Sequence, residues 1–266
     1  MIHLDDSGNY IRVTTPSFNA RLVDTLFDAP ARWRADIITE FRLRGAERCA
    51  AASPTPGFPQ LLDSIMVALA DTPDGGWLDI GGGLGGTASW IERTHHREVI
   101  VADAAMGSLS AARRLFPLLS LAAARVEALP IRDGSVPVAI VSGVVSLLDD
   151  VEPLLAELRR VLHHHGRIAM TDLWSATSTT FDEVPNTFWS LEDLTCVATQ
   201  HGFEVVHLAA ADLSTGWWSS SAEQVSDEID ERYSGESSYT EWRADVDHLD
   251  TIIRAGRVIP AGLVLG

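Results

Sequence analysis

The chain has 266 residues, of which 46% are hydrophobic and 21% are charged, as is usual for a globular protein that buries a core. Its formal net charge of −17 would repel the phosphate backbone of a nucleic acid, so we expect no nucleic-acid partner. No apolar run reaches about 18 residues, and no basic stretch precedes an apolar one at the N-terminus. We therefore expect no membrane span and a cytoplasmic protein.

Residues 1–70 do not alternate strands and helices. Apolar side chains recur at helical spacing over residues 32–44 and again over 58–70. Between these stretches, residues 50–57 are rich in alanine, proline and glycine and predict a break. We interpret residues 1–70 as a helical lead-in or cap.

Residues 71–212 have the pattern of a sheet with alternating helices. The predicted strands are Trp77–Ile80, Val99–Ala102, Leu118–Ala123, Val138–Ser142, Ile168–Thr171 and Phe203–Leu208. Apolar strands that alternate with helices predict an α/β fold, with a mostly parallel sheet and helices on both faces. Ligands of such sheets bind beyond the carboxyl ends of the strands, where Asp79, Asp103, Ser142 and Asp172 fall.

The pattern changes in the C-terminal part. Residues 213–256 carry aromatic side chains among serines and acids, and we interpret them as an inserted, partly helical excursion or lid. Residues 257–266 return to an apolar run, which predicts the last strand of the sheet. No internal repeat is visible.

Five glycines follow the first predicted strand within six residues. Gly81, Gly83 and Gly86 fit the dinucleotide fingerprint G-x-G-x-x-G, and Asp103 follows at the spacing of a ribose-binding acid. The string from Asp79 to Gly85 also fits D-x-G-x-G-x-G, a signature of S-adenosylmethionine (SAM) binding. A carboxylate at Asp79 could hold an ammonium group and would repel a pyrophosphate, which favours SAM. A nicotinamide oxidoreductase remains an alternative.

From Trp77 to Asp172 the chain resembles the class I SAM-dependent methyltransferases, in particular the ubiquinone/menaquinone-biosynthesis and tocopherol-like small-molecule group. The resembling segments are LDIGGGLG at 78–85, VAD at 101–103, EALP at 127–130, LLAELRRVLHHHG at 154–166, RIAMTD at 167–172 and HGFEVV at 201–206. The resemblance implies a Rossmann-like, seven-stranded sheet whose last strand is antiparallel.

The resemblance also implies which residues bind SAM. Asp79 and the glycines of the loop would hold its methionine part, and Asp103 would bind the ribose hydroxyls. Ala104, Val126 and Glu127 would lie near the adenine, and Ser142 near the cofactor. The implied cofactor site is Asp79, Gly81, Gly82, Gly83, Gly85, Asp103, Ala104, Val126, Glu127 and Ser142.

Four positions depart from the family's pattern. Arg125 stands where an acid often contacts the adenine amine, and Pro137 stands where an Asp often begins the fourth strand. Ser146 and Leu147 replace a histidine pair that many relatives carry, so we assign no catalytic base. These departures support an alternative in which the protein binds SAM without methyl transfer, as a rearrangement or cyclisation catalyst or as a partner subunit.

Candidate substrate contacts are Asp172 and Trp174 after the fifth strand, and Trp33 in the lead-in; Trp189, Trp217 and Trp218 could also wall an apolar pocket. His163, His164 and His165 are interpreted as an exposed turn, and the two cysteines lie outside metal-ligand spacing, so no metal site is expected. The sequence predicts a SAM-dependent methyltransferase that acts on a small, fairly apolar metabolite, with natural-product biosynthesis as one setting for such an enzyme.

Overall fold

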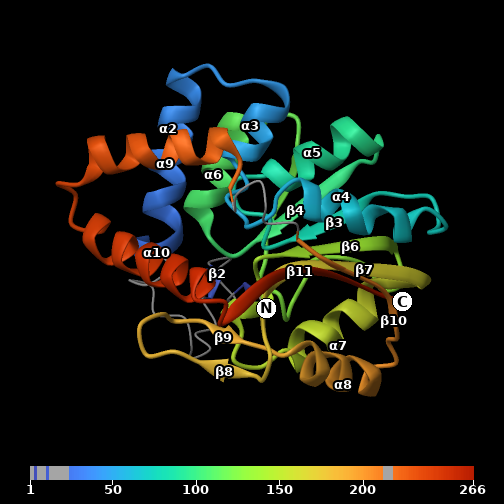
Figure 1. The fold of residues 1–266 in the computed structure, drawn as a ribbon. Coiled ribbons are helices and arrows are strands. Elements are labelled where there is room, and N and C mark those ends of the chain that lie inside the picture. Colours follow the sequence, from blue (N-terminus) through green and yellow to red (C-terminus); the bar gives the residue numbers. More distant parts are fainter. Residues whose placement is uncertain (1–2, 5–9, 12–23, 212–217) are drawn as a thin grey trace.

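The computed structural model describes residues 3–4, 10–11, 24–211 and 218–266, and its centre is a seven-stranded sheet (Figure 1). The strand order is β10-β11-β7-β6-β3-β4-β5. The strands are β3 (Trp77–Ile80), β4 (Val99–Asp103), β5 (Ser120–Ala123), β6 (Val136–Ser142), β7 (Leu162–Ser175), β10 (Val205–Ala210) and β11 (Val258–Leu265). Two further pairs, β1 (His3–Leu4) with β2 (Tyr10–Ile11) and β8 (Thr179–Thr180) with β9 (Thr187–Phe188), lie outside this sheet.

The strands from β7 to β5 are parallel, whereas β11 is antiparallel to both of its neighbours. Such a sheet places the carboxyl ends of β3, β4, β6 and β7 at one edge. The predicted fold class is therefore confirmed, including the antiparallel last strand.

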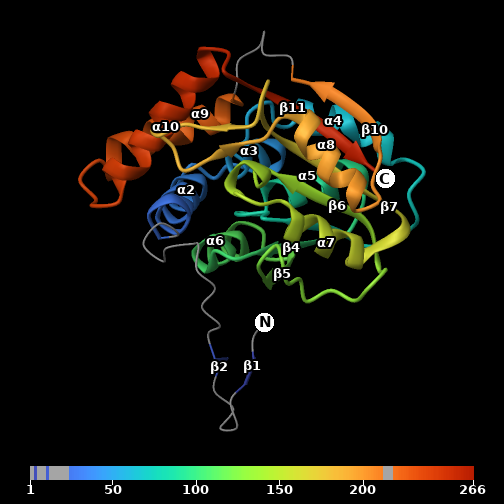
Figure 2. The same ribbon diagram turned by 90° about the horizontal axis from the view of Figure 1, so that it is seen from below.

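Helices cover both faces of the sheet, as Figures 1 and 2 show. The helices are α2 (Ala29–Glu40), α3 (Gly45–Ala51), α4 (Gln60–Met66), α5 (Gly86–His95), α6 (Met106–Leu115), α7 (Glu152–Val161), α8 (Leu191–Gln200), α9 (Ser220–Tyr233) and α10 (Tyr239–Arg254). Short turns of helix are η1 (Asp24–Asp28), η2 (Val67–Leu69) and η3 (Val145–Leu147). No helix among the described residues is long and apolar enough to cross a bilayer.

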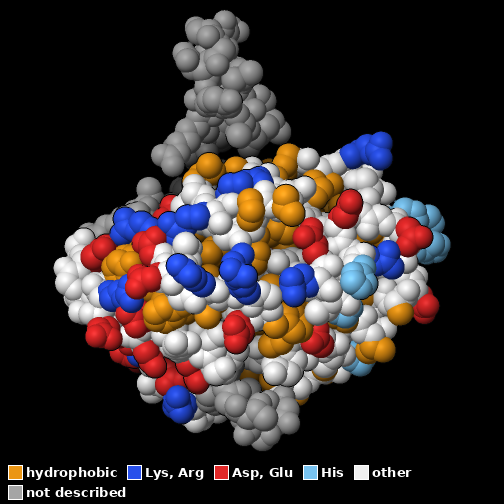
Figure 3. Space-filling model, turned by 90° about the horizontal axis from the view of Figure 1, so that it is seen from above, with side chains coloured by type: hydrophobic (Ala, Val, Ile, Leu, Met, Phe, Trp, Pro, Cys, Tyr) orange, Lys and Arg blue, Asp and Glu red, His pale blue; other side chains and the backbone are white. Residues whose placement is uncertain are grey.

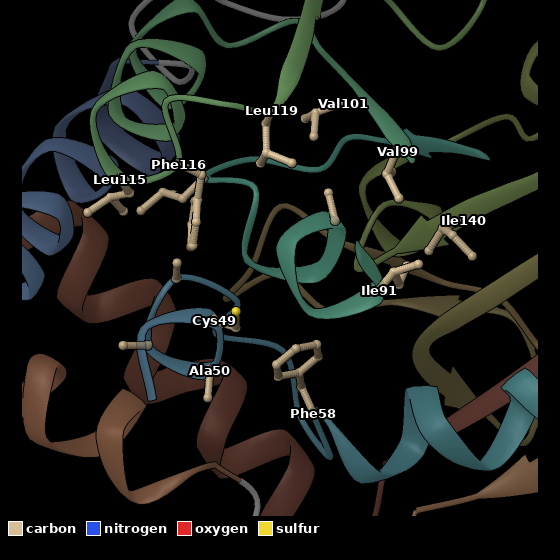
Figure 4. Packing of buried hydrophobic residues seen from close by; sticks show 14 of the residues in the cluster. Cys49, Ala50, Phe58, Ile91, Val99, Val101, Leu115, Phe116, Leu119 and Ile140 are labelled. Atoms are coloured by element: carbon tan, nitrogen blue, oxygen red, sulfur yellow. The ribbon is translucent and has the colours of Figure 1, made fainter. Parts of the chain in front are cut away.

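Alternation along the strands divides the core between the two faces. On β6, Val138 and Ile140 pack with residues of α2 to α6, whereas Ala139 and Val141 pack with residues of α7 and α8. Figure 4 shows part of the first group, where α3 and α5 meet below the sheet strands. On the surface seen in Figure 3, basic and acidic side chains are interspersed with small apolar patches.

Three local predictions differ from the structure. Strand β7 is longer than expected, so His163 to His165 lie in its first part instead of a turn, and Asp172 and Trp174 lie inside it instead of after it. Pro137 is the second residue of β6, not the first; the register with β7 shifts between Val136 and Val138, so no ladder hydrogen bond is needed from it. The second lead-in helix changes to a 3₁₀ turn after Met66.

The described part of the C-terminal excursion is a helical hairpin, α9 and α10, that packs on the lead-in helix α2. Trp33 of α2 stacks on Tyr233 of α9 at 5.4 Å between ring centroids and meets Trp242 of α10 edge-on at 5.8 Å. Residues 213–217 of the predicted excursion lie outside the described residues. Segments far apart in the sequence thus form one wall beside the sheet.

The lead-in is joined to the core at Gly86, the first residue of α5. A Cβ atom at this position would lie 2.5 Å from the carbonyl oxygen of Cys49 and 2.7 Å from the carbonyl carbon of Ala52. These are backbone atoms at the end of α3, and they cannot move aside as a flexible side chain could.

We expect Gly86→Ala to lower the free energy of unfolding by about 3 kcal/mol, because the new methyl group forces α3 away from α5. Gly235→Ala is the matched control: a Cβ atom there meets nothing within 4 Å, so its stability should equal that of the wild type. Urea denaturation of the wild type and the two variants measures the difference in stability. Equal denaturation midpoints for both variants would contradict the close packing of α3 on Gly86.

Candidate functional site

A cavity of about 1630 Å³ lies at the carboxyl ends of the central strands. Its lining comes from the glycine loop, the ends of β4, β6 and β7, the lead-in and α10. Ligand pockets usually measure roughly 300–1,000 Å³, so this cavity has room for two small molecules side by side.

The glycine loop lies directly on the side chain of Asp79. A Cβ atom on Gly82 would come within 2.6 Å of Asp79 Oδ2, so only glycine allows this close approach. Gly81, with a φ of 66°, turns the chain out of β3, and its amide donates to the carbonyl oxygen of Ala102 at 2.7 Å. Gly85 is the N-cap residue of α5 and faces Leu119; it is outside the cavity lining, unlike Gly81, Gly82 and Gly83.

Asp79 is fully buried, and neither of its carboxylate oxygens has a hydrogen-bond partner among the described residues. Burial, together with the nearby charge of Asp103, raises the pKa of Asp79 to about 8. A buried acid without a partner is costly in its charged form. Since Asp79 lines the cavity, a cationic ligand group could relieve this cost.

Asp103, at the end of β4, fixes the other side of the loop. Its Oδ2 accepts a hydrogen bond from the Gly83 amide at 2.8 Å, and its Oδ1 accepts one from the Ala105 amide at 2.7 Å. Burial raises the pKa of this carboxyl, although the amide donors oppose the shift. The Ala104 amide also acts on this carboxylate, and since a carboxylate accepts about four hydrogen bonds, Asp103 can still receive a hydroxyl group from a ligand in the cavity.

The remaining predicted cofactor residues also line the cavity. Ala104 follows Asp103, Val126 and Glu127 follow β5, and Ser142 ends β6. The carboxylate of Glu127 pairs with the guanidinium of Arg125, so the acid and the unexpected arginine neutralise each other. The hydroxyl of Ser142 lies 2.7 Å from that of Thr171 on the neighbouring strand.

The sequence analysis missed Arg34, which lines the same cavity from α2. Its guanidinium is buried and donates to the carbonyl oxygen of Ala51 and the hydroxyl of Ser226, both at 3.2 Å. No carboxylate in the described parts of the chain pairs with it, and burial lowers its pKa to about 10. Nothing in the sequence separates Arg34 from the exposed arginines around it.

The predicted substrate residues fall in different places. Asp172 lines the cavity. Trp33 and Trp174 do not: Trp33 is enclosed by the aromatic side chains of α9 and α10, and Trp174 is buried with its indole nitrogen donating to the carbonyl oxygen of Ala261. Of the other tryptophans considered from the sequence, Trp218 lines the cavity, Trp189 does not, and Trp217 lies outside the described residues; Trp242, which the sequence analysis did not name, also lines the cavity.

No cluster of three or more candidate metal ligands occurs within the described ranges. The rings of His163, His164 and His165 follow one another along β7, with neighbouring centroids 4.0 Å apart. Cys49 is buried and Cys196 is exposed, and neither forms a disulfide.

Residues 78–170 match the family model described as a methyltransferase domain, and this range includes the glycine loop and the ends of β4 and β6. The chain has the fold of a class I methyltransferase. A search of curated protein sequences finds no match.

Solved structures with this methyltransferase fold are similar over most of the chain. A SAM-dependent methyltransferase from Geobacter sulfurreducens, in complex with S-adenosylhomocysteine, has a TM-score of 0.61 and 20% identity, over 88% of this chain and 97% of that one. The [4+2]-cyclase SpnF has a TM-score of 0.61 and 18% identity, over 80% and 86%. Geranyl diphosphate C-methyltransferase from Streptomyces coelicolor A3(2) has a TM-score of 0.57 and 12% identity, over 88% and 97%.

We expect Asp79→Asn to remove a pH-dependent loss of stability. The pKa of Asp79 is raised to about 8 in the folded state, against about 4 in an unfolded chain. Folding therefore becomes less favourable by about 1.4 kcal/mol per pH unit as the pH rises between these two values, and the penalty is constant above pH 8.

Thermal denaturation at several pH values, without ligand, measures this effect. The wild type should lose stability relative to Asp79→Asn from about pH 5 to pH 8. Asp150→Asn removes an exposed carboxylate and should follow the wild-type curve. Parallel curves for the wild type and Asp79→Asn would mean that Asp79 is not buried as an unpaired acid.

Proposed function

We propose that the chain is a SAM-dependent methyltransferase that acts on a small, fairly apolar metabolite. The observation that carries the proposal is an acid and a base buried in the wall of one cavity, neither of which has an oppositely charged partner in the described part of the chain. Asp79 is an unpaired buried carboxylate, and Arg34 is a buried guanidinium without a carboxylate partner in the described part of the chain. SAM carries an ammonium and a carboxylate on the same carbon, and these two charges match Asp79 and Arg34.

The other predicted contacts fit the rest of this cofactor. Asp103 would accept a ribose hydroxyl, and the loop glycines would allow close approach of the cofactor to the backbone. Ala104, Val126 and Glu127 would border the adenine, with Ser142 near the methionine part. When bound, SAM supplies an electrophilic methyl group, so the protein mainly has to orient the acceptor and exclude water.

The cavity's volume and walls support a second, small ligand. Trp218, Trp242 and Leu249 supply apolar surface on the side formed by the C-terminal helices. In this proposal residues 1–70 and 213–256 act as cap and lid over the SAM-binding core of residues 71–212, which residues 257–266 complete. We place the enzyme in the cytoplasm, and in natural-product biosynthesis by analogy with the geranyl diphosphate C-methyltransferase.

A second candidate function is catalysis without methyl transfer. The similarity to the cyclase SpnF supports it, as do the ion pair of Arg125 with Glu127 in the proposed adenine region and the absence of a histidine at Ser146 and Leu147. The two candidates differ in one measurable product: only a methyltransferase converts SAM into S-adenosylhomocysteine when an acceptor is present.

Calorimetry with SAM and with S-adenosylhomocysteine tests the cofactor, and mass spectrometry of incubations with an acceptor panel tests the transfer. We expect both compounds to bind, and S-adenosylhomocysteine to accumulate together with an acceptor that has gained one methyl group. Binding of neither compound would overturn the proposal. Binding without accumulation would favour the second candidate.

Arg34→Met provides a sharper test of the charge match. It should weaken S-adenosylhomocysteine binding about ten- to 100-fold, because a hydrogen bond to a charged group contributes about 1.5–3 kcal/mol when its partner is buried. Binding of 5′-methylthioadenosine, which lacks the amino-acid part, should not change. Calorimetry with both compounds gives, for each compound, the ratio of the dissociation constant of the variant to that of the wild type.

Arg125→Met is the matched control, since Arg125 also lines the cavity but already pairs with Glu127. It should leave the ratio of the two affinities as in the wild type. An Arg34→Met protein that loses affinity equally for both compounds would show that Arg34 does not recognise the carboxylate.

A further inference from the structure

Most acids that line the cavity have an assigned partner or role. Glu127 pairs with Arg125, and Glu157 pairs with Arg160. Asp28 accepts hydrogen bonds from the amides of Gly107 and Ser108 at the start of α6. Asp79 and Asp103 belong to the proposed cofactor site, so Asp172 is the acid for which the proposed function has no use.

Asp172 is buried within the C-terminal part of β7 but forms part of the cavity wall. Its Oδ1 accepts from the Leu173 amide at 2.7 Å, and its Oδ2 accepts from the Ser146 amide at 3.2 Å. The hydroxyl of Ser146 and the amide of Val145 also donate to this carboxylate, so its protein partners are all neutral donors. No basic side chain of the described segments forms an ion pair with Asp172.

The surroundings of Asp172 differ from those of the cofactor site. Leu173, the next residue, packs in a separate apolar cluster with Phe188 of β9 and with Ile252 and Ile253 of α10. Asn186, Trp218 and Trp242 line the same cavity from the β8–β9 connection and the C-terminal helices. The cavity thus combines the carboxylate of Asp172 with apolar and aromatic lining from Leu173, Trp218 and Trp242.

We propose that the methyl acceptor is a primary or secondary amine with an apolar body, and that Asp172 binds its ammonium group. This inference rests on the proposed methyltransferase function. An ammonium ion supplies the positive charge that Asp172 lacks, and tryptophan rings are favourable neighbours for such a cation. An anionic acceptor would be repelled by the Asp172 carboxylate, and a neutral alcohol could donate a hydrogen bond to it but would leave its charge without a counter-ion.

Asp172 also has a chemical role toward such an acceptor. A protonated amine has no free electron pair on nitrogen and cannot be methylated. Transfer of one proton from the ammonium nitrogen to a carboxylate oxygen of Asp172 leaves a neutral amine and a neutral carboxylic acid. Burial raises the pKa of Asp172, which makes its carboxylate a better proton acceptor than an exposed one.

Matched pairs of small molecules test the inference: benzylamine with benzyl alcohol, and hexylamine with hexanol. Each is titrated by calorimetry into the protein saturated with S-adenosylhomocysteine. In the wild type each amine should bind at least about tenfold more tightly than its alcohol, the effect expected of one charge-assisted contact. In Asp172→Asn this preference should disappear.

Asp182→Asn is the control, because it removes the same charge from an exposed position outside the cavity wall. It should keep the preference for amines. Equal binding of amines and alcohols by the wild type, no binding of either amine at millimolar concentration, or an unchanged preference in Asp172→Asn would each overturn the inference. Failure of S-adenosylhomocysteine itself to bind would instead refute the proposed function.

Discussion

The site depends on one buried contact, in which the glycine loop lies on the unpaired carboxylate of Asp79. The contact requires a residue without a side chain at Gly82, and it keeps water away from the acid. The amide of Gly83, held by Asp103, closes the loop from the other side. The loop is thus fixed between two acids, and burial of their charged forms lowers the stability of the ligand-free protein. Binding sites commonly reduce stability in this way.

The rest of the chain completes the walls around that loop. Helix α2 supplies Arg34, whose guanidinium is held by the end of α3 and by Ser226 of α9. The C-terminal helices add aromatic surface, and β7 adds Asp172. The sheet therefore provides the acids, while the segments before and after it provide the opposite charge and the apolar lining.

The sequence was sufficient for features that are local in the chain. The glycine pattern from Asp79 to Gly85, and its distance in sequence from Asp103, can be recognised in the sequence alone. The alternation of apolar strands with helices likewise predicted the sheet. Arg34 could not be predicted, because its burial depends on α3 and α9, which lie far from it in sequence. Trp33 and Trp174 were expected at the cavity for their residue type, but side-chain direction is decided by packing, and both face the interior.

The close packing of α3 against α5 at Gly86 limits how the chain can be divided into parts that fold separately. The α2–α3 segment packs in the same apolar cluster as Val99, Val138 and Ile140 of the sheet. A shortened protein that began at residue 71 would lose α2, α3 and α4 and would expose the apolar side chains that these helices cover on the sheet and on α5. The sheet and its lead-in are therefore a single folding unit, and recombining this sheet with a lead-in from a relative would require the close backbone fit at Gly86 to be kept.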